Sequence, residues 1–257
     1  MSDTKYFTVP IALLQGLISG ERNVKDCMQD IVRYSMYFHA INLPYSDDSE
    51  TGEANKMDTQ IKAAANFLNV KIGDLNTSLT EGKRLYEKYH KKGSCCGVNT
   101  EIVWDYNNNP KTDYQIALFC AFCATRSIIG DGGYKKTNRD LIAARMFGYT
   151  NKEEMLKNTP NITVNNISKS VRSIREKEIA EREKYQNRYH SDKVLTDLEL
   201  DWGLKRYGNH IRGMYISYSV SLEELAKVCE QSKKKAKIDD LKEKKRQAKI
   251  IAETTTS

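Results

Sequence analysis

The sequence has little proline and glycine and no long apolar run. Four prolines and fourteen glycines in 257 residues leave long stretches that nothing interrupts, and such stretches favour helices. No segment approaches the roughly 18 consecutive apolar residues of a membrane-spanning helix. Residues 1–20 contain a short apolar run, but no basic region precedes it. We therefore expect no signal peptide, and a cytoplasmic protein without membrane contact.

Histidines are few, and the carboxylates are plentiful but scattered, with no pair marked out for acid–base catalysis. The four histidines lie outside the common metal and nucleophile motifs. Cys120 and Cys123 have the C-x-x-C spacing, but they fall one turn apart in an apolar segment, where cysteine behaves as a small hydrophobic residue. All six cysteines are expected to be reduced thiols. We predict no enzymatic activity, no bound metal and no cofactor.

Positive charge is concentrated at one end of the chain. The formal net charge is +7, and residues 233–257 carry nine Lys/Arg against four Asp/Glu, so the rest of the chain is close to neutral. A basic tail (221–257) can follow phosphates without sequence preference, or it can serve only to keep the protein soluble. Total charge therefore indicates nucleic-acid binding for the tail alone.

The spacing of apolar residues predicts a mainly α-helical chain. Two N-terminal helices, broken at Gly20, occupy residues 1–45. A second helical unit covers residues 54–106, with Asn69 at the turn between its helices. Its segment TEIVWDY (100–106) is rich in β-branched and aromatic residues and is a predicted strand.

Residues 112–220 combine helices with a single hairpin. Thr112 and Gln115 form a T-x-x-Q capping box, and the helix that they begin is apolar nearly all round, so we expect it to be the buried central helix of its unit. Thr137 and Asp140 suggest a second capping box, before another helix. Residues 150–187 are predicted to be helical, and a further helix covers residues 188–201.

The hairpin is predicted from alternating side chains on either side of a short turn. Residues 203–207 and 211–219 should pair as antiparallel strands around a turn at Gly208 and Asn209. One alternating set should face the core and the other should face water. The expected core set is Met214, Ile216 and Tyr218, and the expected solvent set is Tyr215, Ser217 and Ser219.

The order of buried helix, capped second helix, third helix with a basic start and hairpin resembles the winged helix-turn-helix. The resemblance covers residues 112–220, with 188–201 as the third helix and 150–187 as an inserted helical arm. In such folds the third helix enters the major groove with its N-terminus first, and the hairpin tip lies along phosphates. The resemblance implies sequence-specific binding of double-stranded DNA, in transcriptional control or replication initiation, for example of a mobile element or phage.

The candidate DNA-binding residues have basic or hydrogen-bonding side chains near the expected groove-facing elements. On the third helix they are Arg188, His190, Lys193 and Thr196, and on the hairpin they are Lys205, Arg206, His210 and Arg212. The helix pair at 57–90 resembles a helix-turn-helix of bacterial regulators and adds Lys71, Asn76, Lys83 and Arg84. Two such units in one chain resemble the replication initiators of plasmids and phages. The acidic residues at the far end of the third helix, Asp197, Glu199 and Asp201, should point away from the duplex.

Two alternatives stay open. The helices and the hairpin could form a small α+β core with solvated basic residues, and the chain would then be a protein-interaction or virion-associated module that binds no DNA. The inserted arm carries an apolar stripe of Ile167, Val171 and Ile174. Such a stripe can dock on a neighbouring element or on a second copy of the chain, so a homodimer is one expected arrangement.

Overall fold

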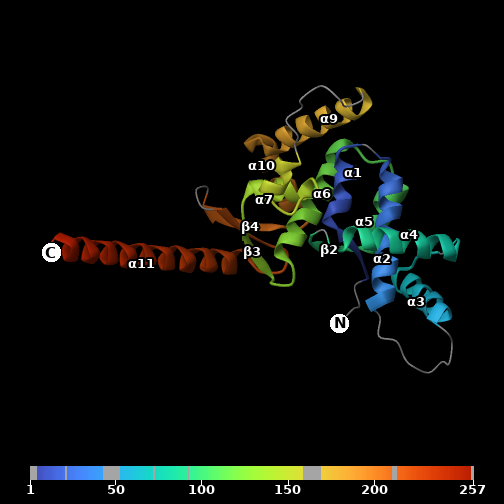
Figure 1. The fold of residues 1–257 in the computed structure, drawn as a ribbon, viewed down its shortest axis with the longest axis horizontal. Helices are drawn as coiled ribbons and strands as arrows, with labels where there is room; N and C mark the ends of the chain where they lie inside the picture. Colours follow the sequence, from blue (N-terminus) through green and yellow to red (C-terminus); the bar gives the residue numbers. More distant parts are fainter. Residues whose placement is uncertain are drawn as a thin grey trace.

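The computed structural model describes residues 5–20, 22–42, 53–71, 73–91, 93–158, 169–209 and 213–255. Across these ranges the chain forms eleven α-helices and two small antiparallel sheets (Figure 1). The predicted fold class, mainly α with a small β-hairpin, is confirmed. Among the described helices, none is both long enough and apolar enough to cross a membrane.

The first described element is a strand, where a helix was predicted. Strand β1 (Tyr6–Pro10) pairs antiparallel with β2 (Cys95–Asn99), and Phe7 lies opposite Val98. A short 3-10 turn (Ile11–Leu13) and helix α1 (Leu14–Ile18) follow. The local sequence gives no sign of this strand, because its partner lies about 90 residues further along the chain.

Three helices form the N-terminal helical layer. Helix α2 (Val24–Asn42) packs against α3 (Glu53–Leu68) and α4 (Leu75–Tyr89). Asn69 lies at the turn after α3 with φ 56°, as predicted for that position. Helices α2 and α4 approach closely at Gly82, where an added Cβ would lie 2.9 Å from the Arg33 carbonyl oxygen.

The segment 100–106 is helical, so the prediction of a strand there is wrong. Helix α5 (Thr100–Asn108) begins at Asn99, whose side chain accepts a hydrogen bond from the Glu101 amide at 2.9 Å. Val103 and Tyr106, three residues apart, are buried on one face. Helix capping and helical burial therefore outweigh the β-propensity of these residues.

Helix α6 (Asp113–Ile129) is the buried central helix that the sequence predicted. The capping box between Thr112 and Gln115 is present, and thirteen residues of α6 are buried. Strand β3 (Tyr134–Thr137), which was not predicted, follows, and then helix α7 (Arg139–Met146).

The residue that caps α7 differs from the prediction. Asn138, and not Thr137, accepts the capping hydrogen bond, from the Leu141 amide at 2.8 Å. Thr137 is instead the last residue of strand β3, where it pairs with Met214. A capping box between Thr137 and Asp140 is therefore wrong.

The inserted arm is partly built into the body. Helix α8 (Lys152–Lys157) buries Met155, and helix α9 (Lys169–Gln186) buries Tyr185 near its end. Helix α10 (Arg188–Asp201) has the bounds that the sequence predicted for the third helix. Of the apolar stripe, Ile167 lies outside the described residues, and for the two others only the helical backbone is described.

The hairpin belongs to a sheet of three strands. Strands β4 (Lys205–Asn209) and β5 (Gly213–Ser217) pair antiparallel, and the order across the sheet is β3-β5-β4. The predicted antiparallel pairing is confirmed. The predicted turn is wrong in position, because Gly208 and Asn209 are paired residues of β4.

Both faces of this sheet are covered. Ile216 is fully buried in the main core, and Met214 and Tyr218 pack partly buried against it. The expectation that Tyr215 and Ser217 face water is wrong, since both are buried. Helix α11 (Leu222–Thr255) covers the outer face, and its early residues Leu225 and Cys229 pack on Tyr215.

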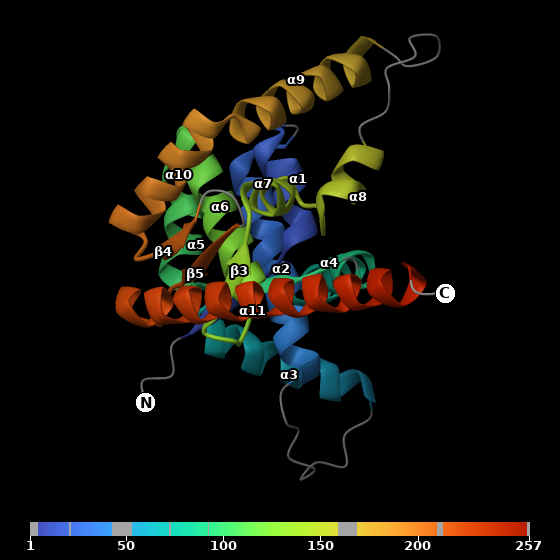
Figure 2. The same ribbon diagram turned by 90° about the vertical axis from the view of Figure 1, so that its left-hand side faces the viewer.

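One hydrophobic core connects the N-terminal helices to the hairpin. A continuous cluster of buried side chains extends from Phe7 in β1 to Ile216 in β5 and includes α2, α6 and α10. The later part of α11 projects away from this body (Figure 1). Figure 2 shows α11 passing in front of the sheet, with α9 and α3 at opposite ends of the molecule.

Candidate nucleic-acid interface

Helix α10 presents its N-terminal half to solvent. It begins at Asn187, whose side chain accepts a hydrogen bond from the Tyr189 amide at 2.9 Å. Three buried residues, Val194, Leu195 and Leu198, fix its inner face against the core. Helical periodicity then places the predicted residues on the outside. Arg188, Lys193 and Thr196 are exposed, and His190 is half-buried.

An open depression lies on this outer face. It is lined by Asn187, Arg188, Tyr189, Asp192, Lys193 and Thr196. The structure therefore brings together three of the four residues that were predicted on this helix. Lys193 Nζ lies 4.4 Å from the centre of the Tyr114 ring, and the Thr196 hydroxyl donates to the Asp192 carbonyl oxygen at 2.9 Å. Both side chains are thereby held at the surface.

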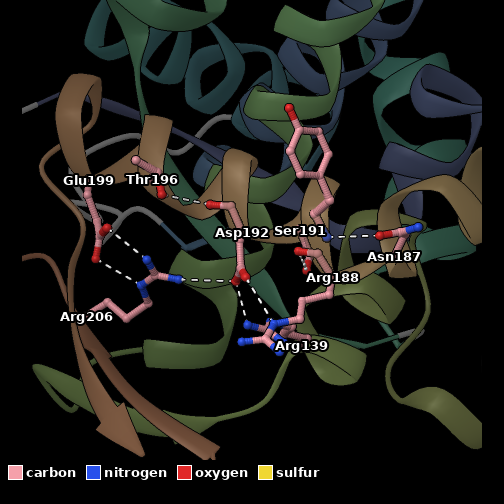
Figure 3. Close-up of polar contacts among 9 residues, drawn as sticks. Arg139, Asn187, Arg188, Ser191, Asp192, Thr196, Glu199 and Arg206 are labelled. Carbon is pink, nitrogen blue, oxygen red and sulfur yellow. Dashed lines mark hydrogen bonds and ion pairs between the residues drawn. The ribbon is translucent and has the colours of Figure 1, made fainter. Parts of the chain in front are cut away.

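Asp192 is the centre of an arginine cluster that the sequence did not reveal (Figure 3). Arg139 of α7 donates to its carboxylate at 2.5 Å. Arg188, one turn earlier in α10, lies 3.7 Å away, and Arg206 of β4 lies 3.8 Å away. A single carboxylate thus joins α7, α10 and the hairpin. The three arginines are 53, 4 and 14 residues from Asp192 in sequence, so no local motif could predict this cluster.

Arg206 also holds a second carboxylate of α10. Its Nε and one terminal nitrogen donate to the two oxygens of Glu199 at 3.0 and 3.1 Å, which is a bidentate pair (Figure 3). The Arg206 side chain is only 23 % exposed. Arg206 was predicted to lie free at the hairpin tip for phosphate contact. The structure instead places it in an internal network.

Of the two remaining acidic residues of α10, Asp197 has a hydrogen-bond partner and Asp201 is exposed. The Tyr114 hydroxyl donates to Asp197. Burial and the neighbouring carboxylate of Asp197 both raise the pKa of Tyr114, so its proton stays in place as the donor. Asp201 is exposed at the far end of the helix. Three of the four acidic residues on α10 therefore have an internal partner.

Of the other predicted hairpin residues, Lys205 is the one that the structure describes, and it does not lie on this face. Lys205 precedes Arg206 in β4, and neighbouring strand residues point to opposite sides of a sheet. Because Arg206 faces α10, Lys205 lies on the side that α11 covers. His210 and Arg212 lie outside the described residues. The sequence reasoning also missed two exposed lysines of β3, Lys135 and Lys136, because the strand itself was not predicted.

The second predicted set of residues lies far from α10. Lys71, Asn76, Lys83 and Arg84 are all exposed on or near α4. Arg84 pairs with Glu81 at 2.7 Å, and Lys83 lies 4.0 Å from Glu87. Both views place α3 and α4 away from α10 (Figures 1 and 2). The two sets therefore do not form one continuous surface.

The cysteines are packed in the interior as free thiols. Cys120 and Cys123 are fully buried in α6, and burial raises the pKa of both. In the part of the chain that the structure describes, no three His, Cys, Asp or Glu side chains are grouped so that they could hold a metal ion.

Comparison of the chain with protein-family models, with curated proteins and with solved structures found no match.

Proposed function

We propose that this chain binds double-stranded DNA with sequence preference through the N-terminal half of α10, in transcriptional control or replication initiation. The observation that carries the proposal is the exposed set of Arg188, Lys193 and Thr196 around one depression. These side chains match the donors that contact phosphates and base edges. The positive end of the helix dipole lies at the same place and also favours an anion.

The acidic residues of α10 would oppose this function if they were free. The helix carries two basic and four acidic residues, so its own charge is negative. However, Arg139 and Arg206 neutralise Asp192 and Glu199, and Asp197 accepts from Tyr114. Arg188 and Lys193 are then the charges that a duplex would meet first at the N-terminal half.

The order of elements also supports the proposal. Helix α6, strand β3, helix α7, helix α10 and the hairpin β4–β5 follow one another, and β3 completes the sheet beside the hairpin. The buried helix, the second helix, the third helix and the hairpin come in the order on which the resemblance to the winged helix-turn-helix rests. Helices α8 and α9 are additional, inserted between α7 and α10.

Helix α11 offers a second, less specific contact with DNA. Residues 233–247 of this helix are mostly exposed and carry eight Lys/Arg against three Asp/Glu, which is +5 of the net +7 of the chain. Each lysine or arginine that neutralises a phosphate releases a counterion, and this strengthens binding at low salt regardless of sequence. We therefore assign affinity to α11 and sequence preference to α10.

A different function, contact with another protein, is favoured by one observation. Tyr189 and Leu200 on α10 are 73 % and 77 % exposed. Large exposed apolar and aromatic side chains are common at protein interfaces. The same surface would then serve an interaction module without DNA.

Selection from a pool of random duplexes, followed by fluorescence anisotropy at two salt concentrations, tests the proposal. We expect a preferred sequence that binds at least about a thousandfold more tightly than random duplex, the lower range for specific DNA-binding proteins. Equal affinity for every duplex would contradict sequence preference. Absence of binding at low salt would contradict DNA binding altogether and favour the protein-interaction function.

A further inference from the structure

Arg206 occupies an unusual position for a residue of the proposed DNA surface. It projects from β4 toward α10, and its guanidinium lies between two carboxylates that are two helical turns apart on the same face. The side-chain exposures are 38 % for Asp192 and 29 % for Glu199, so both carboxylates still reach solvent. Asp192 also lines the depression at the N-terminal half of α10.

A phosphate contact by Arg206 would leave the Glu199 carboxylate without its arginine partner, while Asp192 would keep Arg139. The bidentate pair with Glu199 would have to break, and Glu199 would then repel the same phosphate. Arg188 faces no such obstacle: it is 73 % exposed, and its nearest carboxylate oxygen, on Asp192, lies 3.7 Å away. An exposed, loosely held pair of this kind contributes little to stability. The geometry favours Arg188 for the phosphate and Arg206 for the internal pair.

We propose that Arg206 serves DNA binding as a positioning residue that neutralises Glu199 and Asp192, and that it does not itself contact a phosphate. This inference rests on the proposed function. Arg206 removes repulsion from the face of α10 that approaches the duplex, and it ties the hairpin to that helix. Arg139 performs the same task for Asp192 from α7.

Rescue of binding by a second substitution tests this role in the full-length chain. The variants are Arg206→Gln, Glu199→Gln, the double variant, and Arg206→Gln combined with Asp201→Asn. Asp201 is the control because it is an exposed carboxylate of the same helix, and its removal changes the net charge by the same amount. Anisotropy with a random duplex at low salt gives the dissociation constant, and circular dichroism confirms that each variant is folded.

We expect Arg206→Gln to weaken binding about five- to tenfold, because it exposes carboxylates to the phosphates at short range. Adding Glu199→Gln should restore binding to within about twofold of the parent, while adding Asp201→Asn should restore much less. Glu199→Gln alone should strengthen binding no more than Asp201→Asn alone, because Arg206 already neutralises Glu199 in the parent; a larger gain would show that the released Arg206 contacts the duplex. This comparison keeps Arg206 and so applies even if Arg206→Gln does not fold.

Three results would overturn the inference. Unchanged binding by Arg206→Gln would show that it has no role. Failure of Glu199→Gln to rescue would show that Arg206 contacts the duplex directly. Equal rescue by Asp201→Asn would show that only net charge matters. By contrast, a parent chain that binds no duplex at low salt would refute the proposed function itself.

Discussion

Replacing Ile216 with alanine should destabilise the whole body of the protein. Ile216 lies in the central strand of the three-stranded sheet and is 0 % exposed. Truncation removes its buried side-chain carbons and leaves a cavity, which β3 and β4 on either side of β5 cannot close because they are hydrogen-bonded to it. Substitutions of this kind cost about 2–5 kcal/mol. Because small proteins are stable by only about 5–15 kcal/mol in total, such a loss would be easy to measure.

The two tryptophans allow the same experiment to test whether the core is continuous. Trp104 lies in α5 and Trp202 follows α10, and both pack against the one hydrophobic cluster. In urea titrations, the Trp202→Phe form reports on the surroundings of Trp104, which packs on Phe7, and the Trp104→Phe form reports on those of Trp202, which packs on Phe122. We expect Ile216→Ala to shift both transitions together to lower urea. A cost below about 1 kcal/mol, or a shift of the Trp202 signal alone, would refute the reasoning.

Three further outcomes follow from other parts of the structure. Burial lowers the pKa of His39, whose Nε2 lies 3.2 Å from the Tyr6 carbonyl oxygen. As the pH falls below about 6.5, the unfolded chain gains a proton on this histidine before the folded chain does, so the free energy of unfolding should fall with pH. Chemical denaturation should show a less steep fall in the His39→Gln variant. Gly82→Ala should lower the melting temperature and reduce the free energy of unfolding by about 1–3 kcal/mol, because the new Cβ would lie 2.9 Å from the Arg33 carbonyl oxygen. An unchanged or raised melting temperature would show that α2 and α4 can move apart to accommodate the methyl group. Deleting residues 233–257 should weaken DNA binding and make it less dependent on salt, but it should leave the sequence preference unchanged. Anisotropy on preferred and random duplexes measures both effects. Loss of the preference would place the specific contacts in α11.

The elements with local signals were predictable from the sequence. The capping box at Thr112 and the apolar surface of α6 identified the central helix. The C-terminal end of α10 followed from the uninterrupted helical segment before Gly203. Alternation in 213–217 identified β5 and its pairing with β4. In each case the signal lies within the segment itself.

The elements that depend on distant partners were not predictable. Strand β3 has only four residues and no alternation, and it exists because β5, some 80 residues later, supplies its hydrogen bonds. Tyr215 looked solvent-facing because nothing local shows that α11 returns over the sheet. The partners of Asp192 likewise come from three separate elements, two of them outside α10.

The most direct test of the central claim compares two charge-matched double variants of the full-length chain. Arg188→Ala with Lys193→Ala removes two positive charges from α10, and Lys83→Ala with Arg84→Ala removes two from α4, away from the proposed surface. Both affinities are measured on the selected duplex and on random duplex. We expect the α10 variant to lose about 2–6 kcal/mol on the preferred duplex, if each side chain contributes about 1–3 kcal/mol, and the α4 variant to bind nearly as the parent does. Equal losses in the two variants, or a larger loss in the α4 variant, would contradict DNA recognition by α10.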